Sequence, residues 1–245
     1  MYKYILFKKF SSNSKRGFTL AEVLITLLVI GVVASMVIPA LIQDSQNAET
    51  VTQVKKYQSI LSQATMNIRN DYGSILNSPL NSYIANEWSG DHAAGWNEFK
   101  KQLNLVKDCD TTGKDCWANV MYKHLNGTDW VNFNNYAIVG RGILSDGSLI
   151  DYEAKSNCSL NRSSTNSGPL YNSNCALIII DVNGYKPPNQ GGRDVFVWYI
   201  MKDGTVYPVG SLDDVNRGCD PSSLSSTGKG IGCTAKIIKE GKIDY

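Results

Sequence analysis

An apolar run of membrane length near the N-terminus constrains this chain more than any other feature. Residues 18–42 form a stretch of 25 residues with a single charge, Glu22. As an α-helix rising ~1.5 Å per residue, the run would be about 37 Å long, enough to cross the hydrocarbon core of a bilayer. The sequence therefore predicts a membrane-spanning helix over residues 18–42.

The segment before this run is cationic. Residues 1–17 contain five Lys or Arg residues and no acid, so the positive-inside rule places them in the cytoplasm and the bulk of the chain across the membrane. The whole chain has 24 Lys+Arg and 22 Asp+Glu, and without this leader the balance is 19 against 22. The remainder has no polybasic stripe, so we expect no direct nucleic-acid binding.

Six cysteines point to the same compartment. An even number without a C-x-x-C pattern favours disulfides in an oxidising environment. The simplest pairing is sequential, and each bond would then close a short polar loop, although other pairings remain open. The cysteines are Cys109, Cys116, Cys158, Cys175, Cys219 and Cys233.

Glu22 needs an explanation, because a carboxylate in an apolar membrane helix is unfavourable. One explanation is electrostatic: an acid in the first turn suits the helix dipole. The other is cleavage after Gly17, which would leave the cationic amine of Phe18 among apolar side chains. Glu22 could neutralise that amine in the same helix or a neighbouring one, and such a pair can fix the register of packed helices.

The residues K-R-G-F-T-L-A-E, positions 15–22, followed by an apolar helix, resemble the class III signal of type IV pilins and of the pseudopilins of type II secretion. The resemblance covers about residues 15–72. It implies that a prepilin peptidase cuts after Gly17 and methylates Phe18, and that Glu22 serves assembly. It also places Pro39 near a position where helices of this family often kink.

The resemblance implies a structural subunit of a type IV pilus-like or type II secretion pseudopilus filament. Its expected partners are the prepilin peptidase and methyltransferase, other pilin or pseudopilin subunits, and an assembly platform protein with its ATPase. The expected location is the inner membrane as a single-pass protein, then a periplasmic or extracellular filament.

Two alternatives remain. A minor, tip-located pilin would bind a secreted substrate, a surface or DNA through its head. A membrane-tethered enzyme would use the helix as a plain signal or anchor, with a cut after Ala40 as the nearest option. We expect no enzyme, because the sequence has neither a G-x-S-x-G nor a P-loop motif.

Beyond residue 42 the chain becomes polar but keeps helical periodicity. One apolar stripe in steps of three and four predicts that the helix continues over 43–72 and ends near Gly73. Its members are Val51, Val54, Tyr57, Leu61, Ala64, Ile68 and Tyr72. Residues 73–95 have the composition of a loop. The apolar spacing from Trp96 through Val106 then predicts a short helix that ends at Cys109.

Strand-like stretches follow and complete the organisation. Hairpins are predicted around Asp146-Gly147 and Asp203-Gly204, with the continuous apolar run CALIIIDV between them. About five antiparallel strands covering the half-helix make an α+β fold, which the pilin resemblance also implies. The expected parts are a cleaved leader over 1–17, a transmembrane half-helix over 18–42, an amphipathic half-helix over 43–72 and a globular head over 73–245.

One loop has metal-ligand chemistry. Residues 181–194 contain Asp181, Asn183 and Asp194, and D-x-N-G opens some calcium loops. The spacing is not that of an EF-hand. The alternative is a long turn rich in Gly and Pro because it must bend. Calcium is therefore a hypothesis for this loop, and no other cofactor or metal is expected.

Overall fold

The computed structural model describes residues 17–81, 93–110, 115–135, 140–155, 158, 173–211, 218–224 and 229–245. The chain divides into two compact units, Met1–Ser45 and Gln46–Tyr245. Helix α1 (Leu20–Tyr72) begins in the first unit and ends in the second. The rest of the second unit contains an antiparallel sheet, helix α2 (Ala93–Phe99) and helix α3 (Cys233–Glu240).

The second half of α1 packs against the sheet with the predicted stripe. Its buried residues include Val51, Val54, Tyr57, Leu61, Ala64 and Ile68, which confirms six members of the stripe, and Thr65 joins them. The seventh, Tyr72, was predicted wrongly: it is 36% exposed. It is the last residue of α1, where the helix ends, so its side chain lies at the edge of the core.

Six strands pair antiparallel in chain order, so the sheet is a simple meander. They are β1 (Leu105–Asp110), β2 (Gly140–Leu144), β3 (Leu149–Ala154), β4 (Asn174–Asp181), β5 (Val195–Met201) and β6 (Val206–Pro208). Both predicted hairpins are present. Gly147 and Gly204 have φ of 88° and 84°, a left-handed conformation that glycine adopts without steric cost.

The predicted helix from Trp96 to Cys109 is wrong in its second half. Helix α2 ends at Phe99, a 3₁₀ turn occupies Lys100–Gln102, and β1 then forms the sheet edge. The apolar residues that are spaced as on one helix belong to two elements, α2 and β1. Trp96 is buried, whereas Val106 is 69% exposed. Pairing with β2 decides the conformation, because Lys107 and Asp108 lie opposite Ile143 and Gly142.

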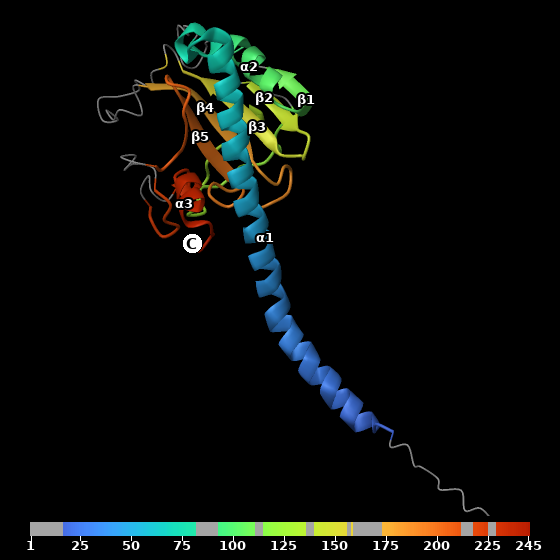
Figure 1. Cartoon of the computed structure of the whole chain (residues 1–245). Helices are drawn as coiled ribbons and strands as arrows, with labels where there is room; N and C mark the ends of the chain where they lie inside the picture. Colours follow the sequence, from blue (N-terminus) through green and yellow to red (C-terminus); the bar gives the residue numbers. More distant parts are fainter. Residues whose placement is uncertain are drawn as a thin grey trace, which may run out of the picture. The chain divides into compact units, whose positions relative to one another are not determined.

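The two hairpin turns hold α1 at opposite ends of the sheet (Figure 1). At one end the Tyr57 hydroxyl lies 2.7 and 2.8 Å from the two carboxylate oxygens of Asp146. At the other end the Thr65 hydroxyl donates to the carbonyl oxygen of Gly204 at 3.0 Å. The turn residues that form the hairpins therefore also fix the position of the helix on the sheet.

The other face of the sheet has a second core. Residues 115–135, which contain no long helix or strand, cover this face with aromatic side chains. Trp117 stacks on Phe133 with ring centroids 4.2 Å apart, and Tyr122 meets Phe133 edge-on at 5.1 Å. The sheet is therefore buried on both sides, and β3 and β5 are buried along their whole length.

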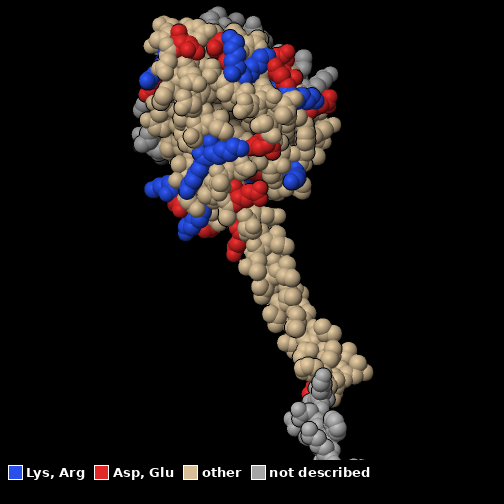
Figure 2. All heavy atoms as spheres, turned by 45° about the vertical axis from the view of Figure 1, so that its right-hand side comes forward, with Lys and Arg blue, Asp and Glu red and all other residues tan. Residues whose placement is uncertain are grey.

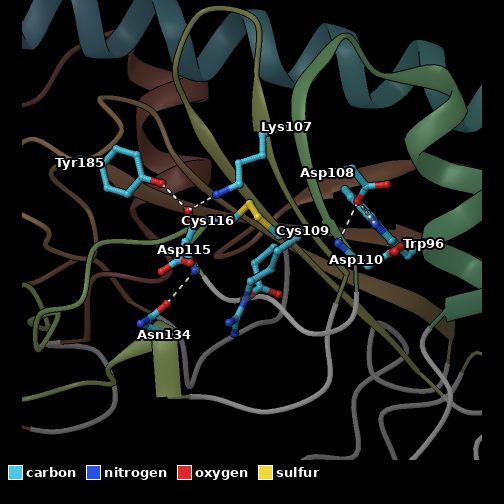
Figure 3. Close-up of a disulfide and its surroundings, with 11 residues drawn as sticks. Trp96, Lys107, Asp108, Cys109, Asp110, Asp115, Cys116, Asn134 and Tyr185 are labelled. Carbon is cyan, nitrogen blue, oxygen red and sulfur yellow. Dashed lines mark hydrogen bonds and ion pairs between the residues drawn. A yellow bond between two sulfur atoms is a disulfide. The ribbon is translucent and has the colours of Figure 1, made fainter.

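All six cysteines form disulfides, and the pairing is the sequential one. The bonds are Cys109–Cys116, Cys158–Cys175 and Cys219–Cys233. Figure 3 shows how the first bond is fixed: the Tyr185 hydroxyl and the Lys107 ammonium both donate to the carbonyl oxygen of Asp115, at 2.8 and 3.2 Å. This disulfide thus ties the sheet edge to the 115–135 segment, and the Tyr185 hydrogen bond joins that segment to the β4–β5 loop.

Candidate functional site

The predicted processing junction lies just outside α1. Gly17, Phe18 and Thr19 are not helical, and the helix begins at Leu20. Phe18 is 88% exposed, and a Cβ added to Gly17 would meet no heavy atom within 4 Å. The peptide bond between Gly17 and Phe18 is therefore accessible to a protease.

Glu22 closes a hydrogen-bonded cap on the start of α1. Its carboxylate accepts from the backbone N–H of Thr19 at 2.8 Å and from the Thr19 hydroxyl at 2.9 Å. In return, the backbone N–H of Glu22 donates to the Thr19 hydroxyl at 3.2 Å. This reciprocal arrangement is a capping box, which satisfies backbone donors that a helix N-terminus leaves free.

The cap refines the explanation of Glu22 that sequence reasoning gave. Thr19 is a partner of Glu22 that neither the helix dipole nor the amine of Phe18 predicts. The T-x-x-E pattern of a capping box was readable in the sequence. In the uncleaved chain the Glu22 carboxylate therefore has local partners, one residue away from the amine that cleavage would create.

The apolar half of α1 presents its side chains outward. Among the described residues, α1 is the one helix long and apolar enough to cross a membrane, and its apolar stretch is not buried. Figure 2 shows the visible face of this segment nearly free of charge. The hydroxyls of Thr26 and Ser35 donate to the carbonyl oxygens of Val23 and Val32, so neither needs a partner from the lipid.

Pro39 lies inside α1, which continues through it. Proline lacks the backbone N–H that the interior of a helix uses and crowds the preceding turn. The kink at Pro39 stays a prediction.

A family model described as the prokaryotic N-terminal methylation motif matches residues 12–38. This match covers Gly17, Phe18 and Glu22 together with most of the apolar helix. It supports the type IV pilin and pseudopilin family, with which the long N-terminal helix on an antiparallel sheet agrees. The chain thus carries the N-terminal methylation signal of pilin-type proteins over these residues. Comparison with curated proteins and with solved structures gives no match.

The head brings together the three predicted ligands of the 181–194 loop, because Asp181 lies near Asp194 and the Asn183 side chain hydrogen-bonds to the Asp194 carboxylate. Asp181 and Asp194 are both buried; burial, and after it the negative charge of Asp194, disfavours ionisation of Asp181. Asp181 accepts a hydrogen bond of 3.0 Å from the Tyr122 hydroxyl. The carboxylate of Asp194 accepts from the backbone N–H groups of Asn189 and Gln190 at 2.7 and 2.6 Å. The two acids thus hold the loop against the second core.

Calcium binding in this loop stays a prediction. The side-chain oxygens of Asn183 and Asn189 are buried there without a hydrogen-bond donor, and amide oxygens are acceptable calcium ligands. Among the residues that the structure describes, no three His, Cys, Asp or Glu side chains group in a way suited to a metal. A calcium ion would therefore depend on two carboxylates plus amide or carbonyl oxygens.

These buried acids make the stability of the head depend on pH. Burial raises the pKa of Asp194 to about 6 and that of Asp181 well above its ordinary value of 3.8. The folded head therefore binds protons more tightly than the unfolded chain, and its free energy of unfolding falls as pH rises between about 4 and about 6. We expect a loss of about 2 kcal/mol over this range, measured by denaturant unfolding of the full chain in detergent.

The matched variant is Asp194→Asn, which keeps one oxygen for the backbone donors and removes the charge. We expect it to remove the contribution of Asp194 to the slope, while Asp181 and also Asp151, a carboxylate whose pKa burial raises to about 6, keep the remainder. An unchanged slope would contradict the assignment. The same measurement at neutral pH with millimolar calcium or with a chelator tests the calcium hypothesis, since a ligand that binds only the folded head raises the unfolding midpoint.

Proposed function

We propose that this protein is a structural subunit of a type IV pilus-like or type II secretion pseudopilus filament. It is inserted in the inner membrane with its head outside the cytoplasm and processed after Gly17. The observation that carries the proposal is the methylation motif over residues 12–38, set at the start of a helix with an exposed apolar surface. Such a surface in water requires cover, by lipid before assembly and by other helices afterwards.

The geometry around Gly17 suits this role. The junction is exposed and non-helical, so a membrane peptidase can bind it in extended form. Cleavage creates the amine of Phe18 next to the Thr19–Glu22 cap. The hydroxyls within the apolar half are satisfied by their own helix, so moving that half from lipid into a helix bundle exposes no unpaired polar group.

The partners that this role requires are the peptidase with its methyltransferase activity, other pilin subunits, and a platform protein with its ATPase. The methylation motif supports the first two classes. Co-purification from the native membrane is the direct way to identify the platform protein.

The decisive test is the mature N-terminus. We expect mass spectrometry of protein purified from cells with an active prepilin peptidase to find a chain that begins at Phe18 with a methylated amine. Replacing Gly17 with leucine places a large side chain at the junction, and this variant should keep its initiator methionine. Wild-type protein that retains the leader, or that begins at Leu41, would refute the proposal.

A further inference from the structure

One face of α1 has no cover within the described part of the head. From residue 46 onward the helix buries the stripe that contains Val51 and Ile68 against the sheet, and the opposite side is open to solvent. This open face consists mainly of small or neutral side chains. Its members are Ala48, Thr52, Ser59, Gln63, Met66 and Asn70, all exposed and all spaced by three, four or seven residues.

Two opposite charges flank this open face. Glu49 and Lys55 are exposed and six residues apart. At ~100° per residue they lie about 120° apart around the axis, one on each side of the open face. Lys56, by contrast, lies on the same flank as Glu49 and already pairs with Asp146 at 2.6 Å.

Neither flanking charge has an acid or base partner among the residues that the structure describes. The ammonium of Lys55 lies near the C-terminal end of α3, 3.2 Å from where a Cβ on Gly241 would be. Carbonyl groups at a helix C-terminus favour a cation but leave its charge uncompensated by any carboxylate. Because Glu49 and Lys55 are on different flanks, they cannot pair with each other in one chain.

The same arrangement suits two parallel copies lying side by side. The Glu49 flank of one helix can face the Lys55 flank of the next, and small residues between the flanks allow close approach. Such a contact joins two different surfaces of the same chain. Contacts of this kind do not close into a dimer, and they generate open helical assemblies when the rotation does not close a ring.

We propose that Glu49 of one copy forms an ion pair with Lys55 of a second, parallel copy shifted along the helix axis. This inference rests on the filament role proposed above and adds its residue-level contact in the head. Six helical residues correspond to an axial shift of about 9 Å.

The other unit of the chain requires a similar shift on independent grounds. If the amine of Phe18 meets Glu22 of another copy, the shift equals the rise from Phe18 to Glu22. One extended residue and three helical ones give about 8 Å. The direction also agrees, since in both contacts the lower-numbered residue of one copy meets the higher-numbered residue of the other.

Charge reversal in the full-length chain tests the pair. We expect Glu49→Lys and Lys55→Glu each to lower the yield of sheared filaments about fivefold or more, and the double variant with both changes to recover most of the yield. Both positions are exposed, so the unfolding midpoint of Glu49→Lys should stay at the wild-type value, and that of Lys55→Glu should fall only slightly, because a carboxylate beside the C-terminal end of α3 is mildly unfavourable. This comparison separates assembly from folding.

The outcomes of the charge-reversal experiment distinguish failure of the ion pair from failure of the filament role. Single variants that assemble like wild type overturn the ion pair and leave the filament role standing. If each single variant gives a lower filament yield and the double variant does not recover it, the ion pair is also overturned, because the losses then do not come from pairing. A wild-type chain that is found in no filament refutes the filament role and this inference together.

Cross-linking supplies a matched control. A chain with Glu49→Cys and Lys55→Cys should give a ladder of disulfide-linked multimers when filaments are treated with a mild oxidant. A chain with Glu49→Cys and Lys56→Cys places the second thiol on the wrong flank and should give none. Two positions six or seven residues apart on one helix are too distant for a bond within the chain. Equal ladders from both chains would contradict the proposed register.

Discussion

Replacing Glu22 with alanine should leave cleavage after Gly17 intact and nearly abolish assembly. The carboxylate lies beyond the scissile bond and makes no contact with Gly17 among the described residues, so the peptidase loses little. In a filament, however, the amine of Phe18 would be buried among apolar helices without a counter-charge. Removing one partner of a buried ion pair costs about 3–5 kcal/mol, so we expect filament yield to fall at least about tenfold.

Two further variants separate charge from capping. Glu22→Gln keeps an oxygen that can accept from Thr19 but removes the charge, and it should fail in assembly almost as badly as Glu22→Ala. Thr19→Ala removes the hydroxyl of the cap and leaves the carboxylate, and its expected cost of about 1 kcal/mol to the helix should reduce assembly only modestly. Filament yield is measured by shearing, with N-terminal mass spectrometry as the check on cleavage. Normal incorporation of Glu22→Gln would show that charge is not what assembly needs.

The parts of the fold that the sequence predicted are those with local signals. Val51, Val54 and Leu61 repeat at helical spacing, and Asp146-Gly147 and Asp203-Gly204 are turn sequences with a stereochemical cause. Each of these signals depends only on neighbours within a few residues. The α+β class and the two hairpins that followed from them are confirmed. The processing and assembly roles of Gly17, Phe18 and Glu22 also come from a contiguous local pattern, and they stay predictions.

The parts that sequence reasoning missed depend on distant partners. Val106 is at a helical spacing from Trp96, but pairing with β2 makes its segment a strand. The aromatic residues of the 115–135 segment do not repeat at helical or strand spacing. Trp117 and Phe133 lie in irregular backbone, and they contact each other because both pack on the same face of the sheet. Likewise, nothing local brings Asp181 and Asp194 together. Their contact depends on the return of the chain from β4 into β5.

Replacing Ile68 with alanine should strongly destabilise the head. Ile68 is fully buried between α1 and the sheet, near the end where Thr65 donates to Gly204. Truncating a buried isoleucine removes apolar contacts and leaves a cavity, which costs about 2–5 kcal/mol. The total stability of a domain is about 5–15 kcal/mol, so the loss is a large share of it.

Met66 provides the matched control two residues away on the same helix. It is 49% exposed, and Met66→Ala should change the free energy of unfolding by less than about 0.5 kcal/mol. Both variants keep the methylation motif of residues 12–38, so both should be cleaved after Gly17. We therefore expect Ile68→Ala to give processed but unstable protein, seen as a lower denaturant midpoint and faster proteolysis of the head. If Ile68→Ala and Met66→Ala unfold at the same midpoint, α1 does not depend on this stripe for its attachment to the sheet. The head would then have to be held mainly by its disulfides and by the second core.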